Sequence, residues 1–318
     1  MGYKTMDANE AVSRVSYKFT EIAGIYPITP ASPMAEKVDV LASKGEINFW
    51  GNKVKVIEME SEKGAIATVH GALQAGVLAT TYTASQGLLL MIPSIYKMAG
   101  EMLPGVIHVA ARSLSTHSLS IFGDHQDIYA VRQTGACMLS SSSVEEAYHM
   151  AMVSHLASIK SSLPFINFFD GFRTSHEIDK VKEIDLSKLE TLIDKKALRK
   201  FRDNGMISGA TTRGTAENED VYFQHTESRN GYYTKAIDNV IYYMDKINKI
   251  CKTDYKPFNY YGDKSSDAVI IAMGSVCECI KEVVDDLNKK GKKVGLVTVH
   301  LYRPFSNSYL SSIIPSSV

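Results

Sequence analysis

Short apolar runs of strand length recur along the first half of the chain and alternate with segments of helical periodicity. The runs are rich in β-branched and aromatic residues and lie at 54–58, 77–83, 105–110, 136–139 and 164–169. One intervening segment, 143–161, opens with the capping-box pattern Ser143-Val144-Glu145-Glu146 and then repeats apolar residues with helical spacing. This alternation predicts an α/β fold with a largely parallel sheet that helices cover on both faces.

The N-terminal segment combines a helical pattern with a proline-bounded loop. Residues 8–24 have apolar positions close to helical spacing, with Asp7 as a cap, and predict a helix that stops at Gly24. A short strand then breaks into Pro27-Ile28-Thr29-Pro30, where two prolines fix the backbone and exclude helix. We therefore expect a rigid loop that holds Thr29 in place.

Open parallel sheets bind ligands at the carboxyl ends of their strands, so the residues that follow each apolar run are the candidates for a binding site. The candidate rim of a site consists of residues 27–30, 59–62, 83–87, 112 and 170–173.

The second half of the chain has a less regular pattern. From about residue 179 it is charged and only partly amphipathic, and 203–231 is polar with little periodicity, which predicts a long connection that wraps the first domain. Segments 267–275, 276–289 and 294–301 then predict strand, helix and strand. The sequence thus predicts one domain over 1–256 and a second α/β domain over 257–318. We expect the second to be truncated, since a full domain of this type has roughly five strands.

Composition narrows the classes of partner. Lys plus Arg and Asp plus Glu both number 35, so no net charge attracts nucleic acid or an anionic membrane surface. The N-terminus lacks a secretory signal, and no apolar run approaches the roughly 20 residues that span a bilayer. The four cysteines are irregularly spaced, which is typical of a reducing compartment. These features predict a cytoplasmic protein, or one in a reducing organelle such as a hydrogenosome.

Two carboxylates, Glu60 and Glu62, lie where the strand at 54–58 gives way to a helix rich in Gly and Ala. A carboxylate in the first turn of a helix either stabilises that helix end or serves a site, and the pattern alone does not separate these readings. Glu60 is expected to be solvated. No Gly-Lys-Ser or Gly-Lys-Thr ending and no Gly-x-Gly-x-x-Gly fingerprint occurs, which disfavours a P-loop and a nicotinamide Rossmann enzyme.

A second group of polar residues follows the strand at 105–110. Arg112 can bind a carboxylate with two hydrogen bonds, although a structural ion pair is the commoner role of such an arginine. His and Asp side chains gather after it, at His117, Asp124, His125 and Asp127. Their spacing matches no strong zinc signature, so a hydrogen-bonded loop is favoured over a metal site.

Taken in order, several segments resemble the N-terminal pyrimidine-binding domain of pyruvate:ferredoxin (flavodoxin) oxidoreductases. They are YPITPAS, EMESEKGAIATVHGAL, TYTASQGLLLMIP, LPGVIHVAAR, SIFGDHQDIYAVRQTG and FFDGFRTSHEI. The resemblance continues through RGTAENEDVYFQ into MGSVCECI and HLYRPF, and so covers nearly the whole chain. It implies a thiamine-diphosphate-binding domain of pyrimidine type, followed by the start of a domain like the C-terminal domain of transketolase.

The resemblance also implies roles for individual residues. Glu62 stands at the position of the glutamate that bonds N1′ of the thiamine aminopyrimidine and favours its imino tautomer. Thr29 and Arg112 correspond to the residues that contact the substrate, so all three are expected to be catalytic. Pro27 and Ile28 are expected to bind the cofactor together with Glu62.

The implied activity is oxidative decarboxylation of pyruvate to acetyl-CoA, with coenzyme A as co-substrate and ferredoxin or flavodoxin as electron acceptor, in a homodimer. No Gly-Asp-Gly segment and no Cys-x-x-Cys-x-x-Cys cluster is present, so magnesium and [4Fe-4S] clusters are expected only in a missing part, and no metal is expected here. We expect half of an active site, inactive alone. The alternatives are a subunit acting on another 2-oxoacid and a non-catalytic remnant.

Overall fold

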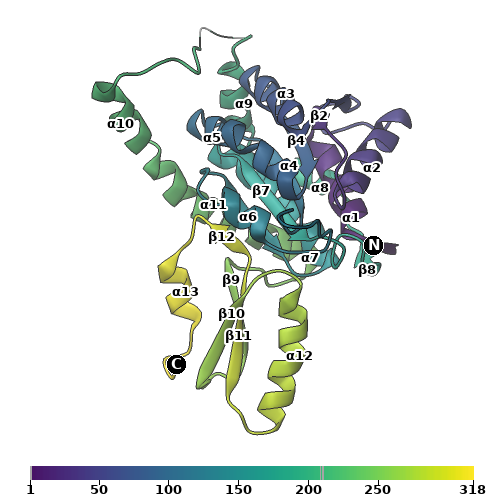
Figure 1. Cartoon of the computed structure of the whole chain (residues 1–318), viewed down its shortest axis with the longest axis vertical. Coiled ribbons are helices and arrows are strands. Elements are labelled where there is room, and N and C mark those ends of the chain that lie inside the picture. The colour runs from purple at the N-terminus through teal and green to yellow at the C-terminus, as the bar shows by residue number, and fades with distance from the viewer. Residues whose placement is uncertain (1, 208, 210) are drawn as a thin grey trace.

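A mainly parallel sheet forms the centre of the larger part of the molecule (Figure 1). The computed structural model describes residues 2–207, 209 and 211–318, and within them seven strands form this sheet in the order β12-β6-β7-β5-β4-β2-β3. Strand β12 pairs antiparallel with β6, and the other neighbours pair in parallel. The predicted α/β fold is confirmed. The strands are β2 (Ile22–Ile25), β3 (Lys55–Glu58), β4 (Ala79–Thr83), β5 (Val106–Ala111), β6 (Cys137–Ser141), β7 (Phe165–Asp170) and β12 (Leu301–Arg303).

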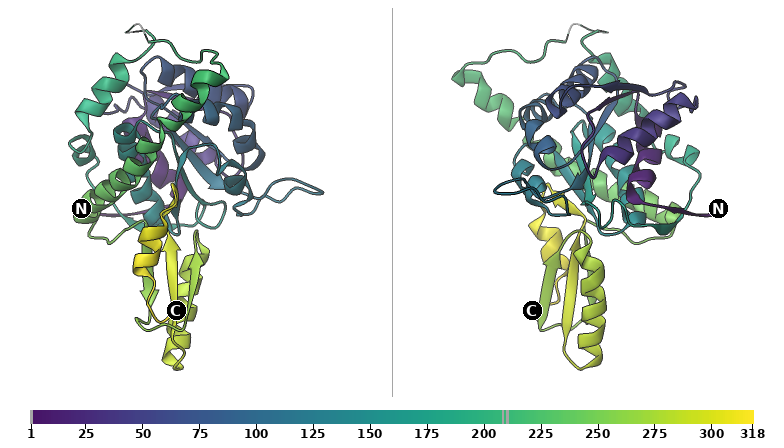
Figure 2. Two further views of the ribbon diagram at one scale, coloured as in Figure 1. Left: turned by 90° about the vertical axis from the view of Figure 1, so that its left-hand side faces the viewer. Right: turned by 45° about the vertical axis from the view of Figure 1, so that its right-hand side comes forward.

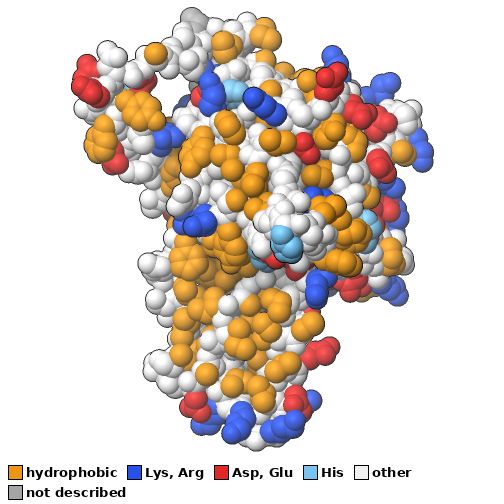
Figure 3. Space-filling model, in the orientation of Figure 1, with side chains coloured by type: hydrophobic (Ala, Val, Ile, Leu, Met, Phe, Trp, Pro, Cys, Tyr) orange, Lys and Arg blue, Asp and Glu red, His pale blue; other side chains and the backbone are white. Residues whose placement is uncertain are grey.

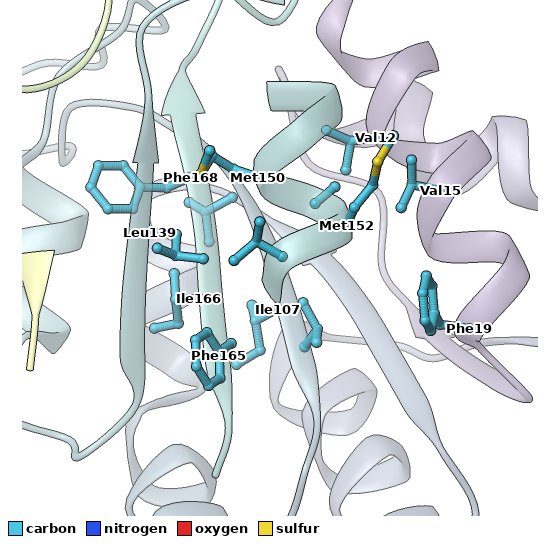
Figure 4. Close-up of a cluster of buried hydrophobic side chains, with 14 of the residues drawn as sticks. Val12, Val15, Phe19, Ile107, Leu139, Met150, Met152, Phe165, Ile166 and Phe168 are labelled. Carbon is cyan, nitrogen blue, oxygen red and sulfur yellow. The ribbon is translucent and has the colours of Figure 1, made fainter. Parts of the chain in front are cut away.

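Helices cover both faces of this sheet (Figure 1). On one face α7 (Val144–Ser161) packs against α1 (Ala8–Phe19) and α11 (Asn230–Cys251). Helix α7 is buried along nearly its whole length, because the sheet lies on one side of it and helices lie on the other. Figure 4 shows this core, in which side chains of α1, α7 and strands β5 to β7 interdigitate. The remaining helices of this region are α2 (Ser32–Ser43), α3 (Glu62–Gln74), α4 (Ser85–Leu90), α5 (Ile92–Gly100) and α6 (Gln126–Val131).

The N-terminal segment departs from the prediction of one helix up to Gly24. Helix α1 ends at Phe19, and Ile22 to Ile25 form β2, which lies next to the edge strand β3. Pairing with β3 on one side and β4 on the other outweighs the helical spacing of the apolar residues. A further strand, β1 (Tyr3–Met6), pairs antiparallel with β8 (Asp179–Lys182), and neither strand was predicted because their pairing joins distant parts of the chain.

The connection at 179–231 contains more helix than its pattern indicated, namely α8 (Ser187–Glu190), α9 (Lys195–Asp203) and α10 (Glu219–Glu227). The long connection predicted over this stretch therefore contains a helix, α10, that its weak periodicity did not indicate. None of the residues of α10, all of which are described, is buried, so no apolar stripe toward the core marks this helix in the sequence. Residues 208 and 210 of this stretch lie outside the described residues.

A smaller sheet follows in the order β10-β11-β9 (Figure 2). Strands β10 (Ala268–Ala272) and β11 (Val294–Val299) are parallel and are joined by α12 (Val276–Lys289), as predicted. Strand β9 (Phe258–Gly262) was not predicted and pairs antiparallel with β11. After β11 the chain returns to the large sheet as β12 and ends with α13 (Asn307–Ile313).

Hydrophobic side chains gather on the surface of this smaller unit (Figure 3). The exposed large ones include Ile270 and Ile271 of the edge strand β10. Among the described residues, no helix is both long enough and apolar enough to cross a bilayer.

Candidate active site

Glu62 is the first residue of α3, directly after the turn that follows β3. The helix is capped by the neighbouring residue, since Ser61 accepts a hydrogen bond from the Gly64 N–H at 3.2 Å. Glu62 is therefore not the capping side chain. It is 7% exposed, and within the described part of the chain no hydrogen bond or salt bridge involves its carboxylate. Glu60 is exposed, as expected. The carboxylate oxygens are not among the fully enclosed polar atoms of the described residues, so a donor that comes from outside can reach them.

The turn between β4 and α4 lies against this carboxylate. A Cβ atom on Gly87 would lie 2.7 Å from Glu62 Oε1 and 2.7 Å from Thr83 Oγ1, so only glycine leaves room there. The Thr83 hydroxyl is buried and has no hydrogen-bond partner among the described residues. Two segments of the predicted rim, 59–62 and 83–87, therefore lie next to each other.

Arg112 follows β5 and reaches the proline-bounded loop. Its Nη1 donates a hydrogen bond to the backbone oxygen of Thr29 at 2.6 Å, so the two residues expected to contact the substrate lie side by side. Its Nε is buried without a hydrogen-bond partner in the described chain. Burial lowers the pKa of Arg112, while the charges of Asp127 and Glu62 act in the opposite direction. Arg112 forms no ion pair within the described residues, in contrast to the structural role that its pattern favoured.

The loop that carries Thr29 is fixed from two sides. Asn9 Nδ2 donates to the backbone oxygen of Pro30 at 3.1 Å, and a Cβ on Gly171 would lie 2.7 Å from Pro30 Cγ. Pro27 and Thr29 are exposed and Ile28 is half-buried, so this loop presents its side chains at the sheet edge. The geometry agrees with the expected rigid loop.

Asp127 was expected only as one member of a hydrogen-bonded loop, and its link to two strand ends was not predicted. It is 0% exposed, and its carboxylate accepts backbone N–H groups of Ser85 at 2.8 Å, Arg112 at 3.0 Å and Ile128 at 2.8 Å. Burial raises its pKa to about 6, against the effect of these three N–H groups. An acidic residue in the first turn of a short helix looks ordinary in the sequence, and only the fold brings β4 and β5 to it.

The other polar residues after β5 do not converge on a metal site. His117 contacts Thr116, and Asp124 accepts the Gln126 N–H. Across the ranges that the structure describes, no group of three or more His, Cys, Asp or Glu is arranged to hold a metal ion. The hydrogen-bonded loop is the arrangement that the structure has.

Asp170, to which His125 bonds, instead links the large sheet to the smaller unit. The Nε2 of His125 lies 2.6 Å from Asp170 Oδ1 at the end of β7, and Asp170 Oδ2 accepts the Ser275 N–H of the smaller unit at 2.9 Å. Burial opposes protonation of His125, but the hydrogen bond to Asp170 and the charges of Asp170, Asp127 and Asp124 together outweigh it and raise the pKa of the imidazole. This contact lies at the same carboxyl-end rim and fixes the smaller unit beside it.

The site therefore has one anionic and one cationic side chain with unused hydrogen-bonding capacity. Glu62 can accept an N–H, and Arg112 Nε can donate to an oxygen. The small residues Thr83 and Gly87 leave space beside Glu62. This donor set fits an aminopyrimidine held at Glu62 and a 2-oxoacid carboxylate held near Arg112.

Comparison with known proteins points the same way. Residues 14–245 match the family described as pyruvate flavodoxin/ferredoxin oxidoreductase, thiamine diphosphate-binding, and residues 266–316 match pyruvate:ferredoxin oxidoreductase core domain II. The sequence is 56% identical over 316 residues to pyruvate-flavodoxin oxidoreductase of Enterobacter agglomerans, and 50% identical over 319 residues to pyruvate:ferredoxin oxidoreductase of Moorella thermoacetica. These alignments cover 99% and 100% of the chain but 27% of each relative.

A solved structure shares the fold. It is 2-oxoglutarate:ferredoxin oxidoreductase from Magnetococcus marinus, with 2-oxoglutarate, coenzyme A and succinyl-CoA bound, and it superposes with a TM-score of 0.75. The match covers 98% of this chain and 56% of that one, at 20% sequence identity.

Proposed function

The chain belongs to the pyruvate flavodoxin/ferredoxin oxidoreductase family, and on that premise we propose that it supplies the pyrimidine-binding and substrate-holding half of a pyruvate-oxidising active site. The chain spans 27% of the length of its relatives from Enterobacter agglomerans and Moorella thermoacetica. The other half, which holds the diphosphate and magnesium, comes in this proposal from residues outside this sequence. The 318 residues alone are then inactive.

The buried carboxylate of Glu62, which has no donor in the described chain, is the observation that carries the proposal. Glu62 holds N1′ of the aminopyrimidine and shares a proton with that atom. A site that excludes water strengthens such a charge-assisted bond. When bound, thiamine diphosphate supplies the nucleophilic carbon and the electron sink that decarboxylation of a 2-oxoacid requires.

The neighbouring residues orient the substrate. The Arg112 guanidinium, tied to the backbone of Thr29, presents its remaining N–H groups to the carboxylate of pyruvate. The Thr29 side chain lies at the exposed edge of the same loop and donates its hydroxyl to the substrate. Pro27 and Ile28, in the same loop as Thr29, would contact the cofactor when it is bound.

The completed enzyme, in this proposal, passes electrons through [4Fe-4S] clusters to ferredoxin or flavodoxin, transfers the acetyl group to coenzyme A and works as a homodimer. The proposed domain boundary at 256/257 separates the pyrimidine-binding domain from the start of the second domain. The strands of the large sheet precede this boundary, with the exception of β12, and the strands of the small sheet follow it, which supports the proposed division.

Joining this chain to the remaining C-terminal part of the Enterobacter agglomerans relative provides the test. Pyruvate- and coenzyme A-dependent reduction of methyl viologen is measured for the fusion and for Glu62→Gln, which we expect to lose at least about 100-fold in kcat. Glu60→Gln, a neighbouring exposed carboxylate, is the matched control and should retain activity. Full turnover by Glu62→Gln would favour a non-catalytic role, and a preference for 2-oxoglutarate in competition would contradict the pyruvate assignment.

A further inference from the structure

We propose that Asp127 is a positioning residue of this site, whose carboxylate ties the turn beside Glu62 to the backbone of Arg112 and so sets the distance between the two groups. The inference rests on the proposed function, since it assigns Asp127 a part in holding pyruvate. Asp127 touches neither substrate nor cofactor in this account and acts through Arg112 and the β4–α4 turn.

A single carboxylate oxygen makes the connection. Asp127 Oδ2 accepts the N–H of Ser85, which follows β4, and the N–H of Arg112, which follows the adjacent strand β5. Oδ1 accepts the N–H of Ile128 within its own helix. The two strand ends that carry the site are thus held together at one buried atom.

The turn that Asp127 holds has an unfavourable backbone conformation. Ser85 has φ of +51°, in the left-handed region that side chains other than glycine rarely adopt. Such a conformation persists only where the surroundings enforce it. Besides the bond to Asp127, the Ser85 hydroxyl donates to the backbone oxygen of Ser113 at 2.6 Å, one residue after Arg112. Two residues further on, Gly87 lies against the Glu62 carboxylate, so a change at Ser85 moves the surface beside Glu62.

Bridging geometry rather than negative charge is the property that this role requires. Asparagine can place its one side-chain oxygen at the Oδ2 position and keep both bridging bonds, although its NH2 group then replaces the oxygen that accepts the Ile128 N–H. Alanine keeps none of the three bonds. The charged groups that face Asp127 are Arg112 and His125, and neither makes a salt bridge to it within the described residues. The two substitutions therefore separate the bridge from the charge.

The fusion described above serves for the kinetic test. Asp127→Ala should raise KM for pyruvate by about 10-fold or more with a smaller change in kcat, because the guanidinium is displaced while Glu62 remains. Asp127→Asn should stay within about 3-fold of the parent in KM. Asp124→Ala, an exposed aspartate of the same segment, should match the parent. An unchanged KM in Asp127→Ala, or an equally large rise in Asp127→Asn, would overturn the proposal.

Two further measurements test the Asp127 bridge separately from the proposed function. If Asp127→Ala does not fold, Asp127→Ser replaces it, since one hydroxyl cannot satisfy both N–H groups, and a KM rise in the same direction is expected. In the 318-residue chain, the amide proton resonances of Ser85 and Arg112 should shift in Asp127→Ser and stay near their positions in Asp127→Asn. This readout needs no turnover, so unmoved resonances would refute the bridge even where the Glu62→Gln result supports the proposed function.

Discussion

Gly87 and Glu62 are in direct contact: a Cβ on Gly87 would lie 2.7 Å from Glu62 Oε1 and 2.8 Å from its Cγ. The two residues come from different strand ends, β4 and β3, and the fold leaves no room between them for a methyl group.

Gly87→Ala should therefore displace the Glu62 carboxylate. We expect a loss of about 10- to 100-fold in kcat of the fusion, because a displaced carboxylate no longer reaches N1′. The free energy of unfolding should change by about 1 kcal/mol or less, since alanine favours helix and offsets part of the steric strain. Gly71→Ala on α3 is the control, because a Cβ there has nothing within 4 Å, and it should leave kcat unchanged. An unaffected kcat in Gly87→Ala would contradict the role of this contact.

Arg112→Lys tests the guanidinium. Lysine keeps the charge but loses the fork of N–H groups, so it cannot bond both the Thr29 oxygen and a substrate carboxylate. We expect KM for pyruvate to rise by about 10- to 100-fold, as for the loss of one charge-assisted hydrogen bond. Arg199→Lys, an exposed arginine on α9, should behave as the parent. A KM equal to that of the parent in Arg112→Lys would remove Arg112 from the proposed site.

A buried histidine pair predicts acid sensitivity of the fold. His108 Nε2 and His155 Nε2 lie 3.1 Å apart, and burial lowers the pKa of His108 to about 3 and that of His155 well below its usual value. The unfolded chain takes up protons below about pH 6.5, whereas the folded chain does not. Above about pH 6.5 both rings are neutral in both states and do not reduce the free energy of unfolding. As the pH falls from there toward the pKa values of the folded state, the free energy of unfolding decreases.

As the pH falls from 6.5 to 5, each ring should lower the free energy of unfolding by about 2 kcal/mol. Urea unfolding at several pH values measures how the free energy of unfolding changes with pH, and this slope gives the number of protons taken up on unfolding. In His155→Gln that number should fall by about one. His117→Gln serves as the control, because His117 is exposed and should leave the slope unchanged. Equal slopes for His155→Gln and the parent would show that this pair does not titrate as described.

The contact between Glu146 and His300 gives a prediction about the two units. Burial opposes ionisation of Glu146, but His300 and the N–H and O–H of Ser142 lower the pKa of its carboxyl to about 2. Its stabilisation is therefore present above about pH 4.5 and is lost as the pH falls toward 2. Glu146→Gln should cost about 1.5–3 kcal/mol at pH 7, because the N–H and O–H of Ser142 lose a charged acceptor. Thermal unfolding of this variant and of Glu145→Gln, the neighbouring control, measures the difference, and equal stability would argue against the pairing.

Local patterns in the sequence were sufficient for the parallel sheet and for the rim residues. The runs that became β4 to β7 are buried along their whole length, and Arg112 directly follows β5. Strand β3, at the edge of the sheet, is less buried, and Glu62 follows it by four residues. Thr29 follows β2 by four residues, in the proline-bounded loop. The bridge at Asp127 was not predictable in this way, since its partners at Ser85 and Arg112 come from strands that only the fold places side by side. Helix α10 was not predicted for another reason. It has no buried face, so its sequence shows no apolar residues at helical spacing.

The return of β12 to the edge of the large sheet has a consequence for how the protein is made. Strand β6 lies inside the sheet only because Leu301–Arg303 pair with it, and this segment follows β6 by the whole of α7, α11 and the small sheet. On the ribosome, the backbone N–H and C=O groups of β6 stay open on that side until residue 303 has been synthesised. A chain cut at 256 would keep this edge exposed for good, so strand-to-strand self-association is the expected fate of a pyrimidine-binding domain produced alone.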